Sequence, residues 1–301
     1  MAMTALEEPA ASAIPAGLAP AKVNLSLRIL GRRSDGYHEL ESLVAFGRHG
    51  AADRVSLSPG GPLKLEIEGA GARKLAGESS NLILRAADAA LTIEPRLTLG
   101  TFRLVKHLPI AAGLGGGSAN AAAALRLIRD ANPHLAKGID WSALAVSIGA
   151  DVPVCLMSRA SLMTGIGERL QPLAGFPPVW AVLANPGQPL ETRAVFNALS
   201  APPLAKVPGV ASPPRFPDLD ALIDALAGQP NDLQPAATQL CPIVATVCAA
   251  LVRLDGALLV RMSGSGPTCF ALFAAAAHAE AAAAKLRFVE PGWWVEPVAL
   301  G

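Results

Sequence analysis

The sequence lacks the signatures of several large classes of protein. Its four cysteines include no Cys-x-x-Cys pair and its five histidines include no His-Glu-x-x-His, which argues against a disulfide framework and against a zinc site of protein ligands. The formal net charge is only +1, which gives no reason to expect a nucleic acid or an anionic membrane as partner. No run approaches the roughly 18 apolar residues of a membrane-spanning helix. We therefore expect a protein of the reducing cytoplasm, whose cysteines are small buried apolar residues.

The length of 301 residues suits one large or two ordinary domains. Residues 1–18 are rich in alanine and proline and have neither the basic start nor the apolar core of a signal peptide, so we expect a frayed tail there. The composition shifts near Arg159, which predicts an N-terminal domain over 19–159 and a C-terminal domain over 160–299. Residues 200–217 hold six prolines and are expected to form a loop.

Helix and strand patterns mix in both halves of the chain. Helices are expected over residues 81–91, 118–128, 141–148, 192–199, 219–227, 243–254 and 274–287. Strands are expected over residues 21–29, 54–58, 63–68, 99–107, 161–167, 178–184, 257–262, 269–273 and 293–298. Because strand and helix do not alternate strictly, the pattern favours a two-domain α+β protein over a doubly wound sheet.

A glycine-rich stretch over residues 109–120 predicts a binding site for phosphate. It begins with Pro109, places four glycines in the five positions 113–117, and runs into an alanine-rich helix. Glycines let backbone N–H groups approach a ligand closely, and a helix N-terminus adds unpaired donors and a positive dipole end. The stretch is no P-loop, because Lys-Ser/Thr does not follow, and no dinucleotide fingerprint, because Ser118 stands where the third glycine would be. The alternative is a flexible loop before a core helix, but four glycines carry an entropic cost that packing alone does not explain.

Three charged or polar positions outside this loop are candidates for chemistry. Strict alternation over residues 21–29 puts Lys22 and Asn24 on one face of a half-buried strand, about 7 Å apart, although such a face can simply be solvated. Lys106 ends a predicted strand at the lip of the glycine loop, where it is either a cation for phosphate or ordinary surface charge.

Asp151 lies between the glycine that ends a predicted helix and Pro153, in an otherwise apolar segment. An unpaired carboxylate is costly in such surroundings. From its position alone, Asp151 is equally well explained as a turn residue paired with a backbone N–H and as a catalytic carboxylate in a dry pocket. A second glycine loop, residues 263–268, lies between two predicted strands and taken alone predicts only a hairpin turn.

Together these segments resemble the GHMP kinase superfamily, named for galacto-, homoserine, mevalonate and phosphomevalonate kinases. Its hallmark Pro-x-x-x-Gly-Leu-Gly-Ser-Ser is similar to residues 109–118, with one extra glycine here. The pairing of Lys22-x-Asn24 with Asp35-Gly-Tyr-His38 is more specific, and resembles members that act on a cytidine-diphosphate-linked methylerythritol. Residues 149–154, 231–235 and 262–268 resemble further motifs of those members, in the expected order.

The resemblance implies a two-domain GHMP kinase architecture with the active site in the cleft between the domains. The implied reaction transfers the γ-phosphoryl group of ATP to the 2-hydroxyl of the methylerythritol, in non-mevalonate isoprenoid precursor biosynthesis. Asp151 is then the implied general base, and Lys22 the cation that stabilises charge on the transferred group. Mg²⁺ is expected because ATP carries it, with Ser118 and the phosphates as its main ligands and no metal site made of protein groups alone.

Two sets of binding residues follow from the resemblance. The implied ATP-binding residues are Lys106, Pro109, Gly113, Leu114, Gly115, Gly116, Gly117, Ser118, Gly264, Ser265 and Gly266. The implied residues for the second substrate are Asn24, Tyr37, His38, Thr192 and Phe196. Tyr37, the one tyrosine of the chain, and Phe196 could sandwich a pyrimidine while His38 reads its edge, although Phe196 could equally be a core helix residue.

Two other functions remain open from the sequence. One is a kinase of the same superfamily that acts on homoserine or a mevalonate-type alcohol, against which the pair Tyr37 and His38 argues. The other is a nucleotide-binding sensor without catalysis, against which the presence of both Lys22 and Asp151 argues. We expect a monomer or a weak homodimer.

Overall fold

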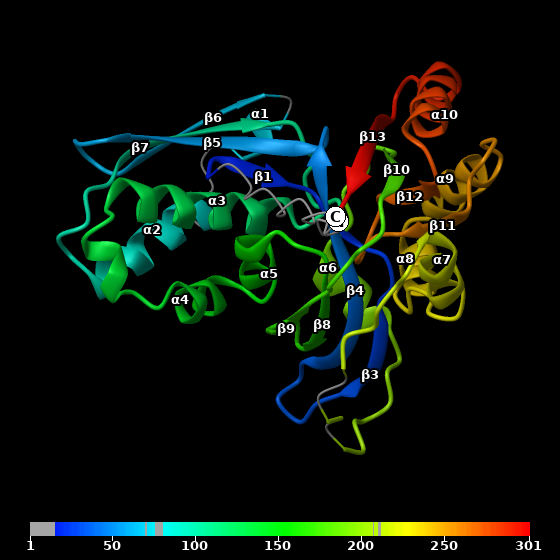
Figure 1. Cartoon of the computed structure of the whole chain (residues 1–301), viewed down its shortest axis with the longest axis horizontal. Coiled ribbons are helices and arrows are strands. Elements are labelled where there is room, and N and C mark those ends of the chain that lie inside the picture. Colours follow the sequence, from blue (N-terminus) through cyan, green and yellow to red (C-terminus); the bar gives the residue numbers. More distant parts are fainter. Residues whose placement is uncertain (1–15, 70, 76–80, 207, 210–211) are drawn as a thin grey trace, which may run out of the picture.

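Two β-sheets organise the chain (Figure 1). The structure, a computed structural model, describes residues 16–69, 71–75, 81–206, 208–209 and 212–301. Most of the expected N-terminal tail lies outside the described residues, and Leu18 already begins the first strand. Within the expected loop 200–217, residues 207 and 210–211 also lie outside them.

The smaller sheet has four strands in the order β1-β5-β7-β6. Its strands are β1 (Leu18–Pro20), β5 (Ala52–Pro59), β7 (Gly100–Lys106) and β6 (Lys64–Gly69). Burial alternates along β7, whose Phe102 and Leu104 enter the core. Two helices, α2 (Leu82–Ile93) and α3 (Gly116–Ala131), pack against this sheet and against each other (Figure 1). The side chain of Asn81 caps α2 by accepting the N–H of Ile83, so the helix begins one residue later than the expected 81–91.

The larger sheet has nine strands and contains segments from both halves of the chain. Its main order is β11-β12-β10-β13-β4-β8-β9, while β2 and β3 pair with β4. The strands are β2 (Lys22–Asn24), β3 (Arg28–Arg32), β4 (His38–His49), β8 (Ser161–Gly165), β9 (Arg169–Pro172), β10 (Val179–Asn185), β11 (Leu259–Met262), β12 (Cys269–Phe273) and β13 (Trp294–Leu300). Because β4 joins strands from both sides of residue 159, the division of the chain there stays a prediction.

Further helices complete both halves. They are α1 (Ala72–Leu75), the 3-10 turn η1 (Leu135–Gly138), α4 (Trp141–Ile148), α5 (Val152–Met157), α6 (Thr192–Ala198), α7 (Leu219–Ala227), α8 (Gln234–Leu240), α9 (Ile243–Val252) and α10 (Ala276–Val289). Helices α9 and α10 contact β12, β10 and β13 on the side of the molecule away from α2 and α3 (Figure 1). The mixture of helix and sheet confirms the α+β prediction.

The predicted half-buried strand over residues 21–29 differs from the structure in two ways. It is broken, because β2 ends at Asn24 and β3 begins at Arg28. Its polar face is also covered, since Lys22, Asn24 and Ser26 are only 5%, 2% and 1% exposed. Both glycine loops pack over this face: the N–H of Lys22 donates to the carbonyl of Leu114 at 2.9 Å, and the N–H of Asn24 donates to Ser263 Oγ at 3.1 Å.

A buried ion pair fixes the chain where β7 leads into the first glycine loop. Asp53 on β5 is fully buried, and its carboxylate accepts from Lys106 Nζ and from the N–H groups of His107 and Leu108, both at 2.8 Å. Lys106 is itself only 4% exposed. One carboxylate thus satisfies three donors and holds the two strands together beneath the loop.

Replacing Asp53 with alanine should destabilise the protein by about 3–5 kcal/mol, because a buried lysine would lose its counter-charge and two buried N–H groups their acceptor. The free energy of unfolding in urea measures this loss. The matched control is Glu68→Ala, which removes the partner of Arg103 in an ion pair whose side chains are 49% and 55% exposed, and which should cost less than about 1 kcal/mol. Equal losses in the two variants would contradict the role given to Asp53.

Candidate active site

The first glycine loop has the backbone conformation that a phosphate cradle requires. Gly113 and Gly115 have φ angles of +73° and +64°, a region that residues with a Cβ rarely adopt. A Cβ on Gly113 would also collide with the carbonyl oxygen of Ser263, and one on Gly115 would lie 3.3 Å from the Lys22 side chain. Helix α3 begins directly after Gly115 and continues for 16 residues, so its free N–H groups face the loop.

The second glycine loop, residues 263–268, packs directly on the first. Ser263 Oγ donates to the carbonyl of Gly113 at 3.0 Å, and the N–H of Thr268 donates to the carbonyl of Ala112 at 3.3 Å. Next to this contact, the hydroxyls of Thr192 and Ser265 share a hydrogen bond of 2.8 Å. The predicted hairpin between β11 and β12 is therefore also one wall of the site.

Lys22 and Asp151 meet across 129 positions of sequence. Lys22 Nζ donates to Asp151 Oδ2 at 2.9 Å, and their side chains are 6% and 36% exposed. Asp151 stands at the N-cap of α5, yet its side chain caps none of the described N–H groups of that helix. Its side chain therefore pairs with Lys22 and not with an N–H group of α5, and its catalytic role stays a prediction.

Lys106 lies under the first turn of α3 and is not surface charge. Its Nζ would be 3.3 Å from a Cβ on Gly116, and Asp53 already supplies its counter-charge. Lys106 nevertheless lines the same cavity as Lys22 and Asp151. The role of Asp53 could not be predicted from the sequence, because an aspartate near the start of a strand is common and nothing local indicates that Lys106 is its partner.

The rings of His38 and Phe196 form one end of the site. Their centroids are 5.1 Å apart and their planes are tilted by 37°. Phe196 is half-buried: it packs against a hydrophobic core and also lines the cavity, so it is in part a core residue, and its contact with a pyrimidine stays a prediction. Tyr37 lies at the mouth and is 60% exposed. Burial, and secondly the positive charge of Arg32, lower the pKa of His38 below its ordinary value near 6.5, so the imidazole is neutral at pH 7.

Two buried amide oxygens have no hydrogen-bond partner among the described residues, Asn24 Oδ1 and Asn120 Oδ1. Both residues line the cavity. Asn24 uses its other amide atom to donate to Ser42 Oγ at 2.8 Å. Buried acceptors without a donor are uncommon in folded proteins, which distinguishes these two residues of the cavity lining. Asn120 is a further residue of the cavity lining that was not predicted from the sequence. The one local indication of it is a single amide side chain in an otherwise alanine-rich helix.

A cavity of about 1060 Å³ brings these groups together. Among the predicted residues, those that line it are Lys22, Asn24, Tyr37, His38, Lys106, Pro109, Gly113, Gly115, Gly116, Gly117, Ser118, Asp151, Thr192, Phe196, Gly264 and Ser265. Leu114 and Gly266 are not among its lining residues, and Leu114 instead belongs to a buried core cluster. The volume of the cavity is at the upper end of the range typical for ligand sites.

The arrangement of these groups in the cavity suits the transfer of a phosphoryl group. The cavity lining includes the glycine loop and the start of α3, which supply backbone N–H groups, and the contacting ammonium of Lys22 and carboxylate of Asp151.

The described residues hold no cluster of three or more His, Cys, Asp and Glu side chains that could bind a metal ion. None of the described helices is long and apolar enough to cross a membrane.

Known proteins share both the sequence and the fold of this chain. Residues 81–159 match the family model of the GHMP kinases N terminal domain, and residues 214–291 match that of the GHMP kinases C terminal. A protein of Methylobacterium radiotolerans named 4-diphosphocytidyl-2-C-methyl-D-erythritol kinase is 49% identical over 289 residues, covering 94% of this chain and 97% of its own. One of the same name from Rhodopseudomonas palustris is 49% identical over 284 residues, covering 92% and 94%.

Solved structures of GHMP kinases are also similar to this chain. A crystal structure of 4-(cytidine 5'-diphospho)-2C-methyl-D-erythritol kinase has a TM-score of 0.69 at 36% identity, covering 94% of this chain and 98% of the other. Homoserine kinase from Cytophaga hutchinsonii has a TM-score of 0.60 at 19% identity, covering 93% and 92%, and shows the shared fold. Both family models and relatives over nearly the whole length lead to one conclusion: this chain belongs to the GHMP kinase family.

Proposed function

We propose that this protein transfers the γ-phosphoryl group of ATP to the 2-hydroxyl of 4-diphosphocytidyl-2-C-methyl-D-erythritol, which gives the 2-phosphate and ADP in non-mevalonate isoprenoid precursor biosynthesis. The observation that carries the proposal is the contact of Lys22 with Asp151 at 2.9 Å, in a cavity that also holds the glycine loop and the ring pair of His38 and Phe196. The names of the relatives with 49% identity support the choice of substrate.

Asp151 is the proposed general base. Its carboxylate would accept the proton of the substrate hydroxyl as that oxygen bonds to phosphorus, which is the proton transfer that phosphoryl transfer to an alcohol requires. Lys22 touches the same carboxylate, so its ammonium fixes the orientation of Asp151 and places positive charge where the transferred group becomes negative. Neither group has to move far, because the ion pair is already formed.

The ATP side is proposed for the two glycine loops. Residues 113–118 would donate N–H groups to the phosphates, and Gly264 and Ser265 would approach them from the other half of the chain. Lys106 is buried with Asp53, so its main contribution would be to hold the floor under Gly116, with its charge partly compensated. Leu114 would act through its backbone, since its carbonyl accepts the N–H of Lys22.

Mg²⁺ fits the oxygen-rich wall of the cavity. Hard divalent cations prefer oxygen ligands, and Ser118, Asn120 and Asp151, whose side chains carry oxygen, line the cavity. Ser118 and Asn120 would hold the ion together with phosphate oxygens. When bound, Mg²⁺ supplies charge neutralisation between the phosphates.

The ring pair is proposed to bind the cytosine. The neutral His38 has one nitrogen that donates and one that accepts, which matches the mixed donor and acceptor edge of cytosine. Phe196 and Tyr37 offer aromatic faces at the same end of the cavity, and stacking on such a face contributes roughly 1–3 kcal/mol per base. Asn24 and Thr192 would contact the methylerythritol or its diphosphate.

A coupled ADP-release assay with three alcohols tests the function. The protein should turn over the cytidyl substrate and leave homoserine and mevalonate unchanged, because only the first carries a base for His38 and Phe196 to bind. Omitting Mg²⁺ should abolish turnover. Turnover of homoserine or mevalonate without turnover of the cytidyl substrate would refute the proposal.

The variant Asp151→Asn should lower kcat by about 10²–10⁴-fold, because the amide keeps the shape of the side chain but cannot take the proton. Calorimetric titration with ATP should give an unchanged Kd. Asp140→Asn is the matched control: Asp140 caps α4 outside the cavity, asparagine caps a helix as well as aspartate does, and activity should stay normal. Near-normal kcat in Asp151→Asn would remove Asp151 as the base.

The KM for the cytidyl substrate should depend on pH through His38. Its pKa is below 6.5, so the imidazole is neutral at pH 7 and gains its proton only as the pH falls further. The proton removes the accepting nitrogen, and KM should therefore be flat above pH 7 and rise in more acidic solution. In His38→Gln, whose amide has a donor and an acceptor at every pH, this rise should be missing. An identical acid rise in that variant would assign the effect to another group.

A further inference from the structure

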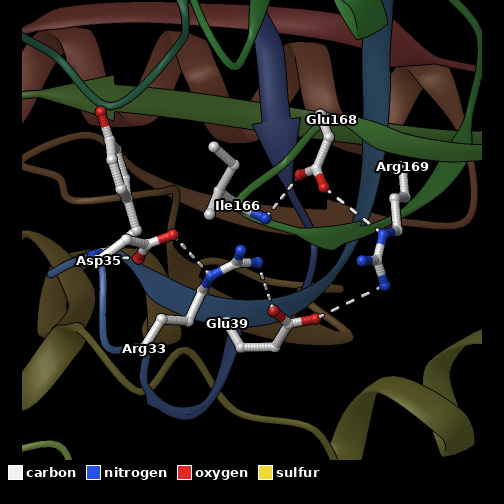
Figure 2. Close-up of polar contacts among 7 residues, drawn as sticks. Arg33, Asp35, Glu39, Ile166, Glu168 and Arg169 are labelled. Carbon is white, nitrogen blue, oxygen red and sulfur yellow. Dashed lines mark hydrogen bonds and ion pairs between the residues drawn. The ribbon is translucent and has the colours of Figure 1, made fainter. Parts of the chain in front are cut away.

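A buried carboxylate lies behind the base-binding end of the cavity. Glu39 follows His38 on β4 and is 2% exposed. Figure 2 shows its carboxylate between two guanidinium groups, with Arg33 Nη1 at 3.1 Å and Arg169 Nη1 at 4.0 Å. The side chains of Arg33 and Arg169 are 27% and 42% exposed, so Glu39 is the inner member of this group.

On one side the contacts lead to the turn that carries Tyr37. Arg33 Nε bonds Asp35 Oδ2 at 3.1 Å, and Asp35 Oδ1 accepts the N–H of Tyr37 at 3.0 Å (Figure 2). The backbone closes the same turn, since the N–H of Arg33 donates to the carbonyl of Tyr37 at 2.8 Å. Tyr37 is otherwise 60% exposed at the cavity mouth, so these bonds are what orders it.

On the other side the contacts lead to the turn between β8 and β9. Arg169 Nε lies 3.5 Å from Glu168 Oε1, and Glu168 Oε2 accepts the N–H of Ile166 at 2.7 Å (Figure 2). Ile166 lines the cavity. The next residue, Gly167, packs on Ala150, whose carbonyl oxygen would lie 3.6 Å from a Cβ there, and Ala150 directly precedes Asp151.

We propose that Glu39 is a positioning residue for the base-binding end of the site: its one buried charge orders both the turn of Tyr37 and the turn of Ile166. This rests on the proposed function for the identity of the ligand. Glu39 itself does not line the cavity, so it acts through Arg33 and Arg169. Without its charge, two guanidinium groups would face each other around a buried neutral group, and both turns would loosen. A loosened turn must be ordered when the ligand binds, which weakens binding.

The test is the variant Glu39→Gln, which keeps the shape and removes the charge. Hydrogen bonds to charged groups are among the strong ones, so the KM for the cytidyl substrate should rise about tenfold. The kcat should stay within about twofold and the KM for ATP should not change, because Lys22, Asp151 and the glycine loops are untouched. Titration with cytidine 5'-diphosphate, which needs no turnover, should show a similar weakening of Kd.

Glu41→Gln is the matched control. Glu41 lies two positions further on β4 and pairs with the exposed Arg28 at 3.0 Å, away from the cavity. Its KM values should equal those of the wild type. Glu39→Asp, which restores the charge on a shorter side chain, should recover part of the affinity, whereas a purely steric role predicts that it is worse than glutamine.

If Glu39→Gln does not fold, Arg33→Gln and Arg169→Gln replace it, since both side chains are partly exposed and each should raise the KM for the cytidyl substrate alone. The proposal is overturned if kcat and the KM for ATP change while the affinity for cytidine 5'-diphosphate does not. It is also overturned if Glu41→Gln has the same effect. A wild type that binds cytidine 5'-diphosphate but does not turn over the substrate would refute the proposed function alone, and a wild type that does neither would refute both.

Discussion

The hydroxyl of Ser263 joins three segments on which the whole site depends. It accepts the N–H of Asn24 on β2 and donates to the carbonyl of Gly113 in the first glycine loop. Ser263 is fully buried, so these bonds are shielded from water and neither partner can be replaced by solvent. The approach is so close that only glycine fits at position 113. The strand of Lys22, the first glycine loop and the second glycine loop therefore form one unit, and all three line the cavity.

Three groups of paired charges with at least one buried member support the site, and each serves a different element. Asp53 with Lys106 fixes the floor of the cradle, Lys22 with Asp151 occupies the middle of the cavity, and Glu39 with its two arginines lies behind the far end. A buried charge is costly without a partner, so each pair also restricts the backbone that carries it. The site is thus held in shape by groups that are mostly out of reach of a ligand. This matches the general requirement that transition-state stabilisation comes from groups already in place.

Much of the secondary structure was predictable, and most of the long-range pairing was not. Helices α4 and α7 have the predicted bounds because local signals, a capping aspartate before each and a glycine after each, mark both ends. Strand β4 was not predicted, because it is paired on both edges and its polar residues Glu39 and Ser42 are buried, which hides any alternation. The short helices α5 and α8 also escaped prediction, since proline-containing segments of six or seven residues look like turns.

In the candidate site too, local conformation could be predicted from the sequence and long-range contacts could not. The glycine loop predicts its own conformation, since left-handed angles need glycine. Lys22 and Asp151 are 129 positions apart, and no local pattern places them in contact; only the resemblance to a family does so. Asp53, Asn120 and Glu39 were not predicted because what distinguishes them is the burial of a polar side chain, which a single sequence does not record.

The continuity of the larger sheet has a consequence for how ligands get in and out. Residue Phe46 on β4 exchanges two backbone hydrogen bonds with Gly301, of 3.1 and 3.0 Å, while the other stretches of β4 pair with β2, β3 and β8. A hinge that swung the two halves apart would have to break this ladder. Access to the cavity is instead left to its mouth, where Tyr37 is 60% exposed. We therefore expect ligands to enter and leave by local movements at this mouth, without separation of the two halves of the chain.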